Sequence, residues 1–227
     1  MLASLLTAVA LSAPAEPPAE AAAGTPRYYF ILYGGQSIPF RPRTAHTWAT
    51  YAKATPMVNG QMAVESFTIS WLPADGPVRP LALRSEVGKN YSLEETFAIA
   101  ERNRDRVSMW GPYEIDAGRY ELAAAQSALL ESGAVRYRVL DTLGRNKSVA
   151  HCVHAVTYAD PVLSRAIQPV IQVGEPGTSR LAARYLRTGA FVGGAVTHDW
   201  VVAALGLDRY PVIRREPGEW IRRRLLR

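Results

Sequence analysis

A chain of 227 residues with 48% hydrophobic and 20% charged residues can bury a core of its own, which excludes a disordered protein. Its single cysteine excludes an internal disulfide. The formal net charge is +6, and residues 214–227 carry six arginines. This Arg-rich tail predicts either a contact with a polyanion or a solvated terminus. No aromatic–basic motif accompanies it, so we expect no specific binding of nucleic acid.

The N-terminus has the pattern of an export signal. Residues 1–13 contain no charged side chain, and their apolar stretch is too short to cross a bilayer. Ala13 and Ala15 form a small-x-small cleavage pattern. We therefore expect a signal peptide over residues 1–15, export to the periplasm or the cell exterior, and no transmembrane span. An uncleaved hydrophobic leader is the alternative.

Residues 16–26 consist mostly of Ala, Pro, Glu and Gly, which predicts a linker. A single α+β domain is expected over residues 27–213, followed by the tail. Its first element is the apolar run 28–33, which does not alternate and so indicates a strand covered on both faces. Gly34-Gly35 is expected to stop this strand. It lacks the further glycines and the helix of a phosphate-binding turn.

Two β-prone segments, residues 46–53 and 64–72, flank Asn59-Gly60, a strong turn signal. They are expected to form a hairpin. The second segment alternates, which puts two sets of side chains on opposite faces: Phe67, Ile69 and Trp71 on one, and Ser66, Thr68 and Ser70 on the other.

Helical signals follow. Ser92 and Glu95 form a capping box that opens a helix ending near Arg104. Residues 117–131 predict an Ala-rich helix that ends before Gly133.

The last part of the domain is expected to contain a strand over 135–140, a helix over 148–158 capped by Ser148 or Asn146, and a short helix over 179–188. Strands followed by helices favour an α+β fold, with an antiparallel sheet packed against several helices.

Cys152 is the first candidate for chemistry because it lies near the start of a predicted helix. Free backbone N–H groups and the helix dipole favour a thiolate there, and a thiolate is the nucleophilic form of cysteine. Free cysteine is also among the most buried residue types, so a purely structural role is the alternative. An unpaired thiol outside the cytoplasm is an oxidation liability, which favours a function.

A nucleophilic cysteine needs a base, and the chain has four histidines. His151 and His154 share the predicted helix with Cys152 and point in other directions. His46 opens a predicted strand, and His198 lies in a loop-like segment. Spacing does not separate these last two.

The segment Ala45-His46-Thr47-Trp48 on a strand, a second strand with polar residues, and a later cysteine at a helix start resemble the circularly permuted NlpC/P60-like, papain-like group. The resemblance covers roughly residues 28–160 as an order of elements. It implies a permuted papain-like fold in which His46 deprotonates Cys152. Thr68 or Ser70 would orient the imidazole. Where many members of the group have asparagine, this chain has His151.

The resemblance implies attack of the thiolate on an amide or ester carbonyl, as in a cysteine peptidase, amidase or acyltransferase. The substrate would be a peptide, a cell-wall component or an acyl compound. We expect no cofactor and no metal. His151, Cys152 and His154 are close in sequence, but residues one and two apart on a helix do not converge on one ion.

The alternative function is a non-enzymatic, exported or envelope-associated binding protein with a structural cysteine. Its aromatic residues would line a groove or fill the core. This alternative expects Cys152 to be buried away from the histidines. The distance between Cys152 and His46 discriminates between the two readings.

Overall fold

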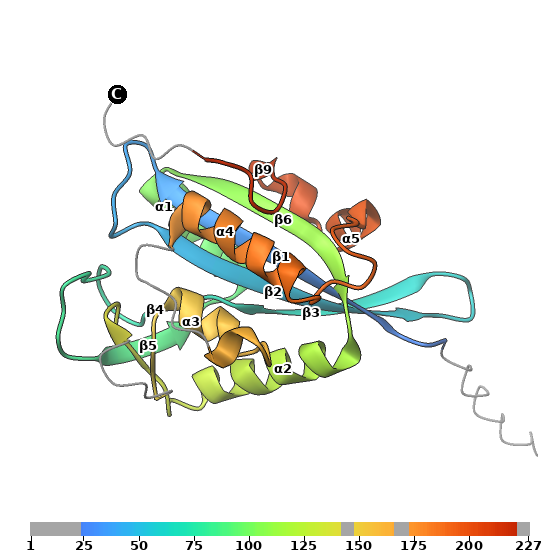
Figure 1. Cartoon of the computed structure of the whole chain (residues 1–227), viewed down its shortest axis with the longest axis horizontal. Coiled ribbons are helices and arrows are strands. Elements are labelled where there is room, and N and C mark those ends of the chain that lie inside the picture. The colour runs from blue at the N-terminus through green and yellow to red at the C-terminus, as the bar shows by residue number, and fades with distance from the viewer. Residues whose placement is uncertain (1–23, 142–147, 166–172, 222–227) are drawn as a thin grey trace, which may run out of the picture.

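The computed structural model describes residues 24–141, 148–165 and 173–221, and it confirms the α+β class. Its largest sheet has the strand order β3-β2-β1-β6-β9 (Figure 1). Neighbouring strands are antiparallel except for the parallel pair β6 and β9. The strands are β1 (Arg27–Ser37), β2 (His46–Pro56), β3 (Met62–Ile69), β6 (Asp105–Ile115) and β9 (Val212–Arg214). The expected signal peptide and the first part of the linker lie outside the described residues.

A smaller sheet lies beside one end of the large one. Its strands are β4 (Trp71–Pro73), β5 (Glu86–Asn90), β7 (Arg136–Tyr137) and β8 (Val149–Ala150), in the order β4-β5-β7-β8. The single residue Ser70 separates β3 from β4. The chain therefore passes from one sheet to the other at this serine.

Helices cover both faces of the large sheet. On one face lie α2 (Ala117–Glu131), α3 (Cys152–Thr157), α4 (Gly174–Arg187) and the short η2 (Leu163–Arg165). On the other lie α1 (Leu93–Asn103), α5 (Asp199–Ala204) and η4 (Leu207–Arg209). Phe30 and Leu32 pack on the first face, and Tyr29 and Ile31 pack on the second. The expectation of a first strand covered on both faces is thus confirmed.

Local signals predicted three elements well. The hairpin of β2 and β3 turns at Asn59-Gly60, where Gly60 has a φ of +77°. The capping box of Ser92 and Glu95 opens α1, as expected. The helix expected over residues 117–131 is α2, which has these same bounds.

Gly34-Gly35 does not stop β1, which continues to Ser37. A Cβ atom on Gly34 would lie 2.6 Å from Thr178 Oγ1 of α4. The glycine therefore allows α4 to pack closely on the strand. Its role is close packing, and the prediction of a strand end there is wrong.

Several later boundaries also differ from the expectation. The strand expected over 135–140 is reduced to β7, and the helix expected over 148–158 is reduced to α3. The helix expected over 179–188 begins five residues earlier, at Gly174. The inner strand β6 had no sequence prediction. Ser148 does not cap α3, and Asn146 lies outside the described residues.

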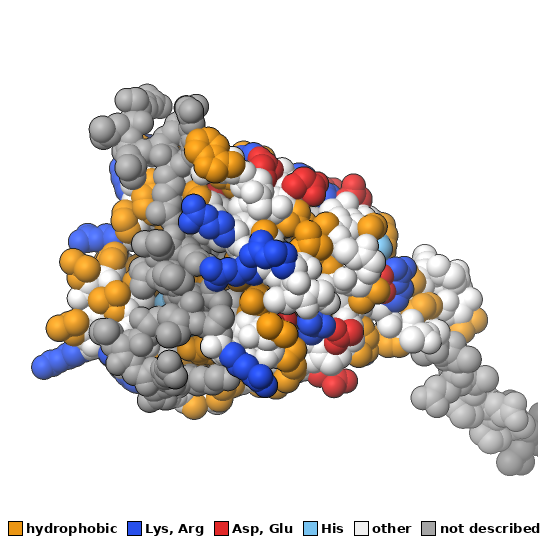
Figure 2. Space-filling view, viewed as in Figure 1, with side chains coloured by type: hydrophobic (Ala, Val, Ile, Leu, Met, Phe, Trp, Pro, Cys, Tyr) orange, Lys and Arg blue, Asp and Glu red, His pale blue; other side chains and the backbone are white. Residues whose placement is uncertain are grey.

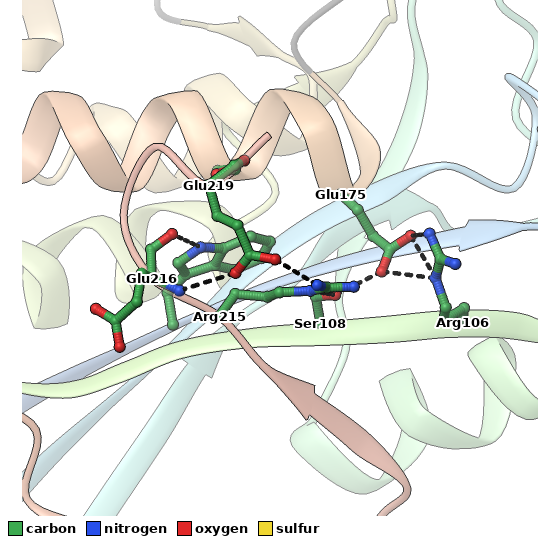
Figure 3. Close-up of polar contacts among 8 residues, drawn as sticks. Arg106, Ser108, Glu175, Arg215, Glu216 and Glu219 are labelled. Atoms are coloured by element: carbon green, nitrogen blue, oxygen red, sulfur yellow. Dashed lines mark hydrogen bonds and ion pairs between the residues drawn. The ribbon is translucent and has the colours of Figure 1, made fainter. Parts of the chain in front are cut away.

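The C-terminal segment packs against β6 and α4 through a polar network (Figure 3). Glu175 of α4 is fully buried and accepts hydrogen bonds from Arg106 Nε at 2.8 Å and from Ser108 Oγ at 2.5 Å. Arg215 donates to Ser108 Oγ at 3.2 Å and to Glu219 at 2.5 Å. The domain boundary expected at residue 213 falls inside β9, and the first part of the Arg-rich tail is ordered.

No helix in the described part of the chain has the length and apolar character needed to cross a bilayer.

Candidate functional site

Cys152 is the first residue of α3 and packs in the core on the face of the sheet that carries α2 and α4. Only 3% of its surface is exposed. Burial raises the pKa of its thiol to about 12, although hydrogen bonds from the backbone N–H groups of Thr47 and Val153 oppose this rise. The thiol therefore stays protonated at neutral pH, and its position at a helix start does not produce a thiolate.

His46 begins β2, and its side chain lies on the opposite face of that strand. The imidazole stacks on Trp48, which packs with α1 residues in the second core. His46 Nε2 lies 2.9 Å from Ser70 Oγ, and Ser70 in turn lies 2.7 Å from Thr96 Oγ1. Burial lowers the pKa of His46 to about 3, so the imidazole is neutral.

The structure thus brings together two of the four residues expected at a catalytic site. The contact with Ser70 fixes one edge of the His46 imidazole. Thr68 instead bonds to Thr50, at an Oγ1–Oγ1 distance of 2.9 Å. Cys152 has no hydrogen bond to an imidazole in the described part of the chain. His198 lies beside Tyr29 and Glu114, near α5.

The sequence analysis did not identify Asp141, a buried carboxylate near Cys152. Asp141 Oδ2 accepts hydrogen bonds from the His151 backbone N–H at 2.7 Å and from His154 Nδ1 at 2.6 Å. The acid and the two imidazoles offer ligand atoms within 4.8 Å of one another. Among the described residues, Asp141, His151 and His154 therefore form a cluster whose ligand atoms are close enough to hold a metal ion.

Hydrogen bonding argues against a metal in this cluster. His151 Nδ1 accepts from the backbone N–H groups of Val153, at 3.0 Å, and His154, at 3.4 Å, and thereby caps α3. The imidazole proton must then sit on Nε2, which faces Asp141 Oδ1 at 3.6 Å. A metal at Nε2 would move the proton to Nδ1, against the helix N–H groups. The cluster fits a helix cap better than a metal centre.

A cleft lies on the His46 side of β2. This cleft, of about 850 Å³, is bounded by the segment before β2, the β4–β5 connection and α1. Three buried polar atoms of its lining residues have no hydrogen-bond partner in the described part of the chain: His46 Nδ1, Trp48 Nε1 and Asp105 Oδ1. Buried polar groups are nearly always paired, so these three atoms need an explanation, and an ordered water, an ion or a bound molecule would each supply one.

The cleft also carries charge. Its lining includes Arg41, Arg43 and Arg102, against the acids Asp75 and Asp105. Burial raises the pKa of Asp105 to about 6, although hydrogen bonds from Thr44 and Asn103 and the charge of Arg41 oppose this rise. A strongly shifted carboxyl group in a cleft is a common feature of binding and catalytic sites.

A smaller apolar pocket of about 170 Å³ adjoins the cleft. The two cavities share four lining residues: Phe40, Pro42, Ala45 and Val78. Cys152 and His151 line this second pocket, together with Tyr137, Val139 and Val173. His46 and Cys152 therefore face two different cavities that meet at the start of β2.

Neither a family model, nor a curated protein, nor a solved structure matches this chain.

Sequence reasoning identified His46 and its partner Ser70. It missed Asp105, which lines the cleft, and Asp141, which bonds to His151 and His154. Asp105 directly follows the predicted end of a helix, where an acidic residue is not unusual, so no sequence signal marked it. Asp141 lies ten residues before His151, and only the fold brings the two together.

Proposed function

We propose that this protein binds a small amphiphilic molecule with an oxyanion head group in the cleft over His46 and Trp48. In this proposal Cys152 is a packing residue at the apolar end of the site. This corresponds to the binding-protein reading of the sequence. Export to the cell envelope, which the N-terminal leader suggests, remains part of the proposal.

The observation that carries the proposal is the set of unpaired polar atoms in the cleft. Leaving a buried donor or acceptor without a partner costs about 1–3 kcal/mol per group. His46 and Trp48 are 6% and 1% exposed, so bulk water does not readily satisfy them. The residues His46, Trp48 and Asp105 line one cleft, and the proposal requires that a single ligand reach their three unpaired atoms.

The chemistry of these atoms favours an oxyanion. Trp48 Nε1 is a donor only, and the three arginines of the lining are donors and cations. Asp105, with its raised pKa, is neutral in mildly acidic solution and then donates a hydrogen bond. A carboxylate, sulfate or phosphate group accepts from all of them.

The size and polarity of the two cavities favour an apolar portion on the same ligand. A volume of about 850 Å³ is within the range of small-molecule sites. The adjoining pocket is lined almost entirely by apolar side chains, and it opens beside the shared residues. An alkyl or aromatic group would pass Ala45 and Val78 to reach it.

Titration calorimetry with dodecanoate tests this proposal. Trp48→Phe keeps the ring but removes the donor, and we expect about tenfold weaker binding because a hydrogen bond to a charged group is lost. Trp200→Phe is the matched control, because Trp200 lies in α5, packs on Tyr29 and does not line the cleft. Equal affinities for the wild type and Trp48→Phe, or no binding of dodecanoate, would contradict the proposal.

One observation favours a second candidate, the cysteine hydrolase or acyltransferase. Cys152 lines a pocket at the start of a helix, next to the Thr47 N–H group. A substrate bound there would place its carbonyl near the thiol. Activity would require a conformation in which the thiol loses its proton to a base other than His46. Hydrolysis of an activated ester that is lost in Cys152→Ala would support this candidate.

A further inference from the structure

We propose that a basic and apolar surface beside the cleft docks on an anionic lipid bilayer. This docking surface consists of Arg79, Leu81, Leu83, Arg84, Val87, Arg136 and Arg138. The three apolar side chains are strongly exposed: Leu81 by 85%, Leu83 by 73% and Val87 by 60%. Large apolar side chains gathered at this exposure indicate an interaction site.

Hydrogen bonds place the cations directly beside the leucines. Arg138 Nη1 donates to the backbone carbonyl of Leu83 at 3.0 Å. Arg136 donates to the side chain and the backbone carbonyl of Ser85, each at 3.2 Å. The segment before β5 is thereby held against β7, with its leucines facing outward.

The charge of this surface matches an anionic membrane. Residues 79–89 and 136–138 contain four arginines and one lysine, and Glu86 is their one acidic residue. Figure 2 shows hydrophobic and Lys or Arg side chains together at the left edge of the molecule, while the visible Asp and Glu side chains lie elsewhere. Basic side chains are attracted to the negatively charged surface of an anionic bilayer. Apolar side chains between them insert into the boundary between the lipid head groups and the acyl chains.

The positive charge of the docking surface argues against a second copy of this chain as its binding partner. Two such surfaces would bring their arginines together, with only Glu86 on each to offset them. A bilayer supplies anionic phosphates for the arginines and an apolar layer for the leucines. The inference stands independently of the ligand proposed for the cleft.

Vesicle sedimentation of the full chain tests the inference. We expect binding to phosphatidylcholine vesicles that contain phosphatidylglycerol, and little binding to phosphatidylcholine alone. The double variant Leu81→Asp with Leu83→Asp should bind the anionic vesicles at least roughly tenfold more weakly. The matched control is Met57→Asp with Val58→Asp, because these two are also exposed, by 49% and 73%, at the distant hairpin turn. The control should bind like the wild type.

Three outcomes would overturn the inference. The first is that the wild type does not bind anionic vesicles. The second is that the leucine variant binds them as well as the wild type, which would assign the binding to a terminus. The third is that the leucine substitutions convert a dimer to a monomer in sedimentation velocity, which would assign the surface to a second copy.

A site-specific label gives a readout that does not depend on either terminus. Leu83→Cys can be labelled with an environment-sensitive fluorophore, because the native thiol of Cys152 is buried. Its emission should shift to the blue on addition of anionic vesicles, and the same label at Val58→Cys should not respond. No shift at position 83 would also overturn the inference.

Discussion

The imidazole of His46 and the thiol of Cys152 lie on opposite faces of β2. His46 stacks on Trp48 on the α1 side, while Cys152, the first residue of α3, packs on the other side and accepts a hydrogen bond from the N–H of Thr47. Because successive side chains of a strand alternate, the backbone of β2 separates the two groups. Direct proton transfer between them does not occur in this conformation. His46 lines the cleft, and Cys152 lines the smaller pocket that adjoins it.

The first prediction concerns the reactivity of Cys152. Its pKa of about 12 leaves almost no thiolate at pH 7–9, and the thiol is buried. Alkylation by iodoacetamide, followed by mass spectrometry, should therefore be very slow at pH 7 and should accelerate only under strongly alkaline or denaturing conditions. The protein in urea is the control and should react readily near pH 8.5. Complete modification of the folded protein at pH 7 would favour the hydrolase.

The second prediction concerns Asp105 and pH. Burial raises its pKa to about 6 in the folded state, above the value of about 3.9 for an unfolded chain. Between these values the folded state binds more protons than the unfolded state, so this group's contribution to stability falls as pH rises from about 4 to 6. Because Asp105 is partly exposed, we expect this loss to be about 1–2 kcal/mol.

Urea unfolding of Asp105→Asn checks this contribution. The variant should be more stable than the wild type at pH 7.5, and the difference should shrink towards pH 4. Asp75→Asn is the control, since Asp75 lines the same cleft and is exposed. A difference between wild type and Asp105→Asn that does not change with pH would contradict the assignment.

The third prediction concerns the network in Figure 3. Glu175→Leu leaves Arg106 and Ser108 without their buried partner and should lower the free energy of unfolding by about 3–5 kcal/mol. Glu94→Leu removes an exposed pair with Arg209 and should cost less than about 1 kcal/mol. Urea unfolding of both variants measures the difference. Similar losses in the two would show that the buried network is not a main support of the fold.

The fourth prediction concerns the close packing of α4 on β1. Gly34→Ala places a methyl group 2.6 Å from Thr178 Oγ1, and we expect a loss of about 1–3 kcal/mol. Gly118→Ala is the matched control in the first turn of α2, where the Cβ atom would meet Asp116 Oδ1 at 3.2 Å. There the better helix propensity of alanine should preserve or raise stability. A neutral Gly34→Ala substitution would show that α4 can move away from the strand without loss.

Elements with strong local signals were predictable from the sequence. The capping box at Ser92, the alanine-rich run of α2 and the Asn59-Gly60 turn each depend on neighbouring residues, and the structure has all three. The inner strand β6 was not predicted, because Gly111-Pro112 interrupts its alternating pattern. Its tertiary pairing with β1 overrides that local interruption.

The site was predictable only in part. The contact of His46 with Ser70 follows from the order of the strands, and both residues were identified. The face of β2 on which α3 packs is set by the whole fold, so the separation of Cys152 from His46 could not be read from spacing. Likewise, the cap of α3 is an imidazole, His151, and not one of the usual small polar residues.

The most direct test of the proposed function is a titration of the protein with dodecanoate, followed through the indole N–H signals in a ¹H–¹⁵N correlation spectrum. Trp48→Phe assigns the Trp48 signal. Trp71 and Trp110 are internal controls, because their Nε1 groups already donate to the carbonyls of Ala150 and Glu216. We predict that the Trp48 signal moves with a saturable dependence on dodecanoate while the two controls stay in place. A Trp48 signal that does not move at saturating dodecanoate would contradict the proposal that this cleft is the binding site.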